Sequence, residues 1–543
     1  MIGRGRLAVA AALAVSLVAA SCGSSNDEVS TAQTGGSTSG ASATTVEGGT
    51  TTSVSLAIAS SEGGSGAITD PSKLPTNMDD WEKLWAEQRA AIVKRIKDNG
   101  WGVSADGTTL TGPEGFEVDL SKCATGWDPT EGLTDDEIRT GQTIAESGTL
   151  AYAINYPHGQ RAVLNYYNEQ GAFADVNGKT RKVRYIDKDD GYDPAKTVPL
   201  VDELIDSEKV FGITTGGSPH TLKVYDKLNQ RCIPHLFNQT GHPAWGDPAN
   251  HPWTTGLGLA YTTEAVLWGS FIEDHLDEFP DGVTVAALVM ANEFGKAYDV
   301  GFRGFLENSP NKDKISYVTE TVDPAAPTIT NQMTTLAGKN PDVFIDMVAG
   351  VACTQAVIEA AQNGMKESVK YLWQPGTCAG STQLSKEKVG GDGSASEGWW
   401  IVNGGAKDIR DPQQQNDPAV IWARELITAN GQDPDSAAEL GLGFIYGWAW
   451  AQALQIAGQL DGGLNRPNLL LAARSMDMNN PLQLPGLVFH ANGNADSYFT
   501  EGGVFQQFSV ASQSYVSKTD VFNLDGQSKN CKFDQSSGTC ELY

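Results

Sequence analysis

The sequence is short of positive charge. Its 543 residues include 38 lysines and arginines against 66 aspartates and glutamates, so the formal net charge is -28 at pH 7. A surface this acidic repels the phosphates of nucleic acids and the headgroups of anionic lipids. The composition therefore predicts no nucleic-acid partner and no binding to an anionic lipid surface through charge.

The sequence also lacks the short motifs of common catalytic and cofactor sites. It contains no GxSxG, HExxH or Walker A motif, and no GxGxxG at a strand–helix junction. The acidic pairs Asp135-Asp136 and Asp189-Asp190 fall in predicted loops, where we interpret them as solvated. We expect no enzyme activity, no cofactor and no metal.

Long apolar runs are missing after the first twenty or so residues, so no later segment is predicted to span a membrane. Arg4 and Arg6 precede an apolar run over 7–20, which has the length of a secretory signal. Small residues directly before Cys22 resemble the lipobox of bacterial lipoproteins, although Ala19 stands where leucine is usual. We predict a signal peptide over 1–21 and a lipid on Cys22 that holds the protein at the outer, extracytoplasmic face of the cell membrane. The alternative is an ordinary cleaved signal with an incidental cysteine.

The segment after Cys22 has no lysine, arginine or aromatic residue as far as Asp70, and is rich in Ser, Thr and Gly. Such a composition cannot bury enough apolar surface to fold. We predict a disordered, lipid-anchored tether over 22–74. An N-terminal extension follows over 75–134, with an amphipathic helix at 81–97 and a hairpin-like stretch; the sequence assigns it no function.

Six cysteines remain besides Cys22, an even number that suggests disulfides in an exported protein. Many pairings are possible, but proximity in the sequence favours Cys531 with Cys540 and Cys353 with Cys378. Cys123 and Cys232 then pair by elimination. No Cys/His spacing argues for zinc.

From residue 136 onward, strand and helix patterns alternate, which is typical of parallel sheets covered by helices on both faces. The alternation restarts after a helix near 262–275, so we predict two α/β lobes. Open α/β sheets bind ligands at the carboxyl ends of their strands, and this places the expected site in a cleft between the lobes. The predicted strands are 137–145, 183–187, 210–214, 232–237, 283–289, 315–322, 343–348 and 369–373. The predicted helices are 150–168, 194–205, 219–229, 262–275, 295–306, 328–336 and 353–363.

Nine segments carry a family resemblance over about residues 134–510. Each segment alone is weak evidence, but their order and spacing together are specific. The segments are LTDDEIRTGQT, NYYNEQGAF, DDGYDPAKTVPLVDELI, FGITTGGSPHT, CIPHLFNQT, ANEFGKAYDVGF, NPDVFIDMVAG, ASEGWWIVNG and YGWAWAQALQIAG. The chain resembles the type I periplasmic binding proteins, specifically the branched-chain amino acid (Leu/Ile/Val)-binding protein family of ABC importers. The resemblance implies two lobes joined by a three-strand hinge. Residues 135–262 and 402–480 would build the first lobe, and 263–401 and 481–543 the second.

The resemblance places ligand contacts in the first lobe after three of its strands. Gly217, Ser218 and His220 lie in a loop that opens a helix, where backbone N–H groups favour a carboxylate. Ser218 could instead simply cap that helix. The end of the next strand is where the family has its second carboxylate-binding segment. Polar side chains at a strand end are also ordinary turn residues. The candidates there are Asn238, Gln239 and Thr240, and after the first strand they are Ser147, Tyr152 and Tyr156.

In the second lobe the candidates are Phe294, Gly350 and Gln374. Phe294 could stack on a ligand or pack in the core. Amino-acid-binding members of the family present a carboxylate to the ligand ammonium where this chain has Gln374, and the segment after Gly350 lacks their tyrosine. A neutral amide does not balance an ammonium. This departure favours an organic acid, amide, urea-like or aromatic solute.

The sequence therefore predicts an extracytoplasmic solute-binding lipoprotein, a monomer, that captures a small polar molecule and delivers it to an ABC permease. The alternative is a binding protein of the same fold that reports its ligand to a membrane receptor.

Overall fold

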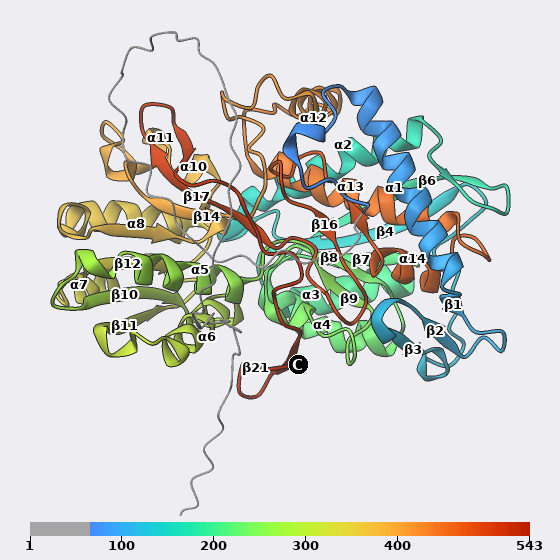
Figure 1. The fold of residues 1–543 in the computed structure, drawn as a ribbon, viewed down its shortest axis with the longest axis horizontal. Coiled ribbons are helices and arrows are strands. Elements are labelled where there is room, and N and C mark those ends of the chain that lie inside the picture. Colours follow the sequence, from blue (N-terminus) through green and yellow to red (C-terminus); the bar gives the residue numbers. More distant parts are fainter. Residues whose placement is uncertain (1–65) are drawn as a thin grey trace, which may run out of the picture.

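The computed structural model describes residues 66–543, so Cys22, the signal segment and most of the predicted tether lie outside the described residues. Within that range the chain forms two helix-covered sheets, which lie side by side in Figure 1. The predicted fold class, a two-lobed α/β structure of the type I periplasmic-binding-protein kind, is confirmed. None of the described helices is long and apolar enough to cross a membrane.

The first sheet has six strands in the order β5-β6-β4-β7-β8-β9. All neighbours are parallel except β5, which is antiparallel to β6. Its strands are β4 (Glu137–Ile144), β5 (Phe173–Ala174), β6 (Thr180–Asp189), β7 (Gly212–Thr215), β8 (His235–Asn238) and β9 (Thr254–Gly256). The helices that connect them are α2 (Asn155–Glu169), α3 (Pro194–Asp202) and α4 (Ser218–Gln230).

The second sheet has eight strands, β11-β10-β12-β13-β14-β17-β18 with β19 paired to β17. The strands from β10 to β14 are parallel, whereas β17 is antiparallel to its three partners. The strands are β10 (Val283–Met290), β11 (Ile315–Val322), β12 (Val343–Met347), β13 (Tyr371–Gln374), β14 (Trp400–Asn403), β17 (Gly502–Ser509), β18 (Ser514–Ser517) and β19 (Phe522–Asn523). Its helices include α5 (Tyr261–Asp274), α6 (Glu293–Asn308), α7 (Thr330–Ala337), α8 (Val351–Gln362) and α9 (Met365–Ser368), followed by the short turns α10 (Ser381–Leu384) and α11 (Lys386–Val389).

The chain passes between the two sheets three times: after β9, after β14 and before β17. The segment between the last two passages carries three helices whose buried residues belong to the apolar core of the first sheet. These are α12 (Pro418–Ala429), α13 (Glu439–Gly458) and α14 (Arg466–Ala473), followed by β15 (Asp477–Met478) and β16 (Phe489–His490). A second apolar core lies under α5, α6 and the strands of the second sheet.

The N-terminal extension packs on the first core through helix α1 (Met78–Asp98), which Figure 1 shows beside α13. Trp81, Trp85, Gln88, Ile92 and Ile96 lie on one face of this helix and are buried, as their three- and four-residue spacing requires. The predicted hairpin-like stretch is a three-stranded sheet of β1 (Gly102–Val103), β2 (Thr109–Thr111) and β3 (Glu117–Asp119).

The three predicted disulfides are all present: Cys123–Cys232, Cys353–Cys378 and Cys531–Cys540. The first ties the extension to the segment before β8. The last closes the tail hairpin of β20 (Cys531–Asp534) and β21 (Thr539–Leu542).

Two predictions are wrong. The predicted disordered tether does not reach residue 74, because Ala67 is buried and the Ile68 N–H donates to Asn479 Oδ1 at 2.8 Å. Asp190 does not lie in a solvated loop: it is buried, and its carboxylate accepts hydrogen bonds from the Tyr192 backbone N–H and from the Thr197 hydroxyl, both at 3.0 Å. Burial raises its pKa to about 6, and these two hydrogen bonds partly offset that shift. The carboxylate holds the turn after β6 together, and a pattern of adjacent acids does not reveal that role.

Candidate functional site

Two loops of the first sheet meet at the carboxyl ends of β7 and β8. Gly217 has a φ of 89°, and a Cβ there would lie 2.6 Å from His220 Nδ1, so the turn into α4 requires glycine. Ser218 follows at the start of α4, and its Oγ lies 2.7 Å from Thr240 Oγ1. The structure thus brings two of the predicted contacts, Ser218 and Thr240, together as one hydroxyl pair.

Asn238 and Gln239 lie beside this pair, and their side-chain amides differ in how many of their hydrogen bonds are already made. The Asn238 amide is fully used: its oxygen accepts from Thr215, and its nitrogen donates to the carbonyls of His235 and Thr255. The Gln239 oxygen accepts from Gln142 Nε2 at 2.7 Å, while its own Nε2 has no hydrogen-bond partner among the described residues. Asn238 therefore supports the loop, and Gln239 keeps a donor that a ligand could use.

His220 lies directly under this loop. It is buried, its ring centroid is 4.6 Å from that of Tyr192, and its Nε2 is 3.9 Å from Asp190 Oδ1. Burial lowers its pKa to about 4, so the imidazole is neutral at neutral pH. Tyr192 has a φ of 60°, a conformation uncommon for an aromatic residue and found disproportionately at functional sites.

Four tyrosines on the first-lobe side of the cleft form a cluster with Tyr261, the first residue of α5. Tyr152 comes from the turn before α2 and Tyr156 from the first turn of α2, while Tyr192 comes from the loop after β6 and Tyr446 from α13. Burial raises the pKa of each, and the neighbouring phenols raise it further in each case. The pKa of Tyr261 rises to about 12, held down in part by Thr240, Gly241 and Ser218. The cluster is therefore a set of neutral hydroxyls beside the Ser218–Thr240 pair.

Ser147 lies apart from this cluster. It is exposed, and it hydrogen-bonds the carboxylate of Asp189, which helps to lower the pKa of that acid. The structure does not bring Ser147 to the other candidates.

The second lobe contributes Phe294 and Asn292 from the start of α6. The Phe294 ring is 5.0 Å from Tyr261 and 5.3 Å from Tyr298, and the side chain is 4% exposed. Asn292 caps α6 by accepting from the Gly295 N–H, and its Nδ2 donates to the Tyr192 hydroxyl at 3.4 Å. This hydrogen bond joins the second lobe to the first across the cleft.

Gly350, at the start of α8, marks a second place where the two sides touch. Its φ is 70°, and a Cβ there would lie 2.8 Å from the Thr149 carbonyl oxygen and 2.9 Å from Leu150 Cδ1. No other residue fits without moving the opposite side. A backbone hydrogen bond of Gly350 with the Tyr152 hydroxyl also partly offsets the rise in the pKa of Tyr152.

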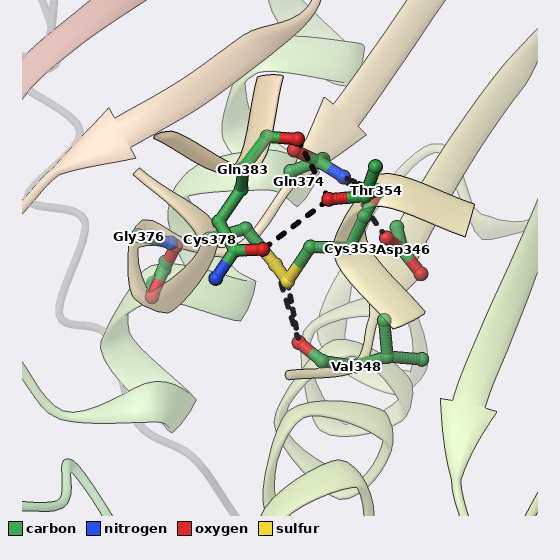
Figure 2. The surroundings of a disulfide bond; sticks show 9 residues. Asp346, Val348, Cys353, Thr354, Gln374, Gly376, Cys378 and Gln383 are labelled. Carbon is green, nitrogen blue, oxygen red and sulfur yellow. Dashed lines mark hydrogen bonds between the residues drawn. A yellow bond between two sulfur atoms is a disulfide. The ribbon is translucent and has the colours of Figure 1, made fainter. Parts of the chain in front are cut away.

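Gln374 points into the second lobe rather than toward the tyrosines. Its Nε2 donates to the Cys353 carbonyl at 2.7 Å and to Asp346 Oδ2 at 3.2 Å, and both side chains are fully buried. Figure 2 shows this group around the Cys353–Cys378 disulfide, which joins the start of α8 to the turn after β13. Burial raises the pKa of Asp346 far above its usual range, so Asp346 is a neutral acid.

Two buried acids at the site were not predicted from the sequence. Glu439 is the first residue of α13, and its charge helps to raise the pKa of Tyr152 and Tyr156. Its Oε2 has no hydrogen-bond partner among the described residues. Glu264 on α5 accepts from the Tyr298 hydroxyl at 2.7 Å and from the Gly376 N–H at 2.6 Å. Tyr192 and Tyr261 were missed as well. Each reaches the site through long-range packing, which no local motif records.

A cavity of about 160 Å³ lies between the first turns of α4 and α6 and the tail hairpin, and neither Ser218 nor Phe294 lines it. A smaller cavity of about 60 Å³ lies at the passage between the sheets, against Tyr446. The larger one is lined by Pro219, Leu222, Lys223, His242, Glu293, Lys296, Ala297, Phe533, Gln535, Ser536, Ser537 and Gly538.

Comparison with known families gives one match, to the periplasmic binding proteins, over residues 137–501. The solved structures most similar in fold include three ABC-transporter proteins. A fatty acid ABC transporter substrate-binding protein from Thermomonospora curvata has 17% identity and a TM-score of 0.61, over 73% of this chain and 95% of that one.

The second is a branched chain amino acid ABC transporter protein from Thermus thermophilus with bound valine, at 15% identity, TM-score 0.60, and coverage of 72% and 97%. The third is an R. palustris solute-binding protein in complex with 4-hydroxybenzoate, at 17% identity, TM-score 0.58, and coverage of 72% and 98%. A search of curated protein sequences found no significant match.

Proposed function

Since this chain belongs to the periplasmic binding protein family, we propose that it captures a small molecule in the cleft between its lobes and delivers it to an ABC permease. The observation that carries the proposal is the convergence of polar groups at the carboxyl ends of both sheets. Ser218 and Thr240 come from the first lobe, and Asn292 from the second. Binding proteins of this architecture need no covalent chemistry.

Closure supplies the signal that a permease reads. Ser218, Thr240 and Phe294 are at most 4% exposed, so a ligand reaches them only when the lobes separate. A ligand that touches both lobes only in the closed arrangement shifts the population toward it. The Asn292–Tyr192 hydrogen bond and the tight approach at Gly350 are the contacts that closure forms.

The ligand we propose is a small organic acid with an apolar or aromatic body. Three helices, α4, α6 and α8, begin at the cleft, and their N-terminal N–H groups favour a carboxylate. The tyrosine cluster and Phe294 offer ring faces and hydroxyls to the rest of the molecule. The similar structures are named for a fatty acid, valine and 4-hydroxybenzoate, all of which are carboxylic acids.

A ligand ammonium has a less obvious partner. Gln374 is neutral and is bonded within its own lobe. Glu439 is the one buried carboxyl next to the tyrosines with an oxygen left unbonded among the described residues, and burial raises its pKa. We therefore propose that amino-acid ligands bind more weakly than acids without an ammonium.

A thermal-shift screen tests the ligand class. The panel compares 4-hydroxybenzoate, short fatty acids and the three branched-chain amino acids on the purified protein. A ligand at one hundred times its Kd should stabilise the protein by about 2.7 kcal/mol. The largest shift should come from an acid without an ammonium. Largest shifts from leucine, isoleucine or valine, lost in Glu439→Gln, would instead assign Glu439 as the ammonium partner and refute the ligand class.

Ser218→Ala tests the placement of the cleft. It removes a hydroxyl whose hydrogen bond contributes about 0.5–1.5 kcal/mol, so we expect affinity for the best ligand to fall up to about tenfold. Ser368→Ala is the matched control, because Ser368 is exposed and bonds only its own helix at Gly364. Equal affinities in the two variants would contradict the placement.

The anchor at Cys22 is part of the proposal. Six other cysteines pair in disulfides, which leaves Cys22 for lipid attachment. Two acyl chains would hold a monomeric binding protein near its permease. Cys22→Ala should release the protein from membranes into the medium; retention on membranes would rule out the lipid anchor.

The second candidate function is sensing, in which the closed state is read by a membrane receptor. The same geometry supports it, because closure presents a new surface to any partner. Uptake of the ligand by cells with and without this protein separates the two: loss of uptake supports transport, and unchanged uptake supports sensing.

A further inference from the structure

Three side chains outside the cleft converge near the C-terminal tail. His490 ends β16, Asp496 lies in the turn that follows, and Asp525 follows β19. His490 Nδ1 lies 3.3 Å from Asp496 Oδ2 and 3.2 Å from Asp525 Oδ1. One ligand atom from each residue lies within 4.8 Å of the other two.

Asp496 is the most constrained member of this trio. It is 3% exposed, and its Oδ1 accepts from the Tyr498 N–H at 3.2 Å. Its Oδ2 is buried and accepts no hydrogen bond from any described residue, although it faces His490. A buried carboxylate oxygen of this kind is costly unless a cation lies beside it, and here that cation is either protonated His490, 3.3 Å away, or a bound metal ion.

A third carboxyl group lies behind the trio. Glu501 is 4% exposed, and it accepts from the Gly526 N–H at 2.6 Å and the Ser528 N–H at 2.7 Å. It is already satisfied, and it fixes the turn that presents Asp525. Burial raises the pKa of Glu501 well above its usual range, and Asp496 adds to the rise.

We propose that His490, Asp496 and Asp525 bind a divalent transition-metal ion, with zinc as the best fit. Ligands at zinc-to-ligand distances of roughly 2.0–2.1 Å in a tetrahedron stand roughly 3.3–3.4 Å apart, close to the His490 separations. An imidazole nitrogen with two carboxylates is a donor set for zinc-like ions, whereas calcium and magnesium prefer oxygen alone. A fourth, solvent position completes the coordination.

The ion would act as a structural clamp. Phe489 and Phe499, on either side of the His490–Asp496 turn, belong to the core of the first sheet. Asp525 belongs to the tail that leaves the second sheet after β19 and leads to the Cys531–Cys540 hairpin. The clamp thus fixes the tail, which lines the cavity beside α4 and α6. It does not depend on the proposed transport function.

Equilibrium dialysis of tag-free, chelator-treated protein against Zn²⁺ tests the site. We expect one zinc ion per chain, retained against excess Mg²⁺ or Ca²⁺. Asp525→Asn and His490→Gln should each weaken binding by at least about 10- to 100-fold, the loss typical even of outer-shell partners. Asp520→Asn is the matched control, because Asp520 is exposed and lies just upstream in the same tail.

Asp525 is partly exposed, so its variant is expected to fold, and circular dichroism checks this. Zinc binding that is equal in wild type, Asp525→Asn and Asp520→Asn would overturn the site. Absence of zinc binding in all of them would also overturn it and leave His490 as an imidazolium paired with the two carboxylates. Displacement of zinc by equimolar Ca²⁺ would overturn the choice of a transition metal.

Discussion

Burial in the wall of the cleft strongly shifts the pKa of Glu264. It is 3% exposed, and burial raises its pKa to about 7 although Tyr298 and Gly376 donate hydrogen bonds to it. Its ordinary pKa is 4.5. The folded state therefore keeps a proton that the unfolded chain releases between about pH 4.5 and 7, and stability falls as the pH rises through that window.

Glu264→Gln should remove this dependence. Between pH 5 and pH 8 the wild-type free energy of unfolding should drop by about 2–3 kcal/mol more than that of the variant. Urea unfolding at the two pH values measures the difference. Glu425→Gln, at an exposed position on α12, should behave as wild type. The same pH dependence in Glu264→Gln and wild type would contradict the assignment.

At the residue scale, the sequence predicted the site only in part. Ser218, Thr240 and Phe294 follow strand ends, and family resemblance located them. Tyr192, Tyr261, Glu264 and Glu439 reach the site through packing of distant segments, so no local pattern marked them. Gln374 was placed on the right strand, but its hydrogen bonds to Cys353 and Asp346 turn it inward.

Among the elements, helix α1 has a role that the sequence could not supply. Trp85 is fully buried, its ring is 5.7 Å from those of Trp422 and Trp448, and its Nε1 donates to the Asn479 carbonyl at 2.9 Å. The helix therefore covers α12 and α13 of the first lobe. It is a structural part of that lobe rather than a separate unit.

Trp85→Ala should destabilise the protein by about 3–5 kcal/mol, because a large buried aromatic leaves a cavity. Glu87→Ala, on the exposed face of the same helix, should change stability by less than about 0.5 kcal/mol. Chemical denaturation of both variants measures the contrast. A small loss for Trp85→Ala would mean that the extension is only loosely attached.

The element pattern was otherwise well predicted, because strand and helix periods are local properties. Most observed boundaries differ from the predicted ones by a few residues. Strands β5, β9, β14 and β17–β19 of the two sheets were not predicted, and neither were helices α12 and α14. Strand β17 pairs with β14, about a hundred residues earlier in the chain, so its register depends on the assembled sheet.

At the scale of the whole molecule, the two lobes already touch in this arrangement. The contacts at Gly350 and between Asn292 and Tyr192 join their facing edges. The sequence predicted Gly350 as a site residue, but it did not predict the contact between Asn292 and Tyr192. The lobe boundaries 135–262 with 402–480, and 263–401 with 481–543, remain a proposal. The presence of two parallel, helix-covered sheets, by contrast, follows from the alternating pattern.

The most direct test of the account is a crystal structure of the protein with the strongest ligand from the thermal-shift screen. We predict ligand density between the lobes, with its carboxylate near Ser218 and the start of α4 and its body against Tyr261 and Phe294. Ligand density at another place, with the space beside Ser218 filled only by solvent, would contradict the central claim that this cleft captures the solute.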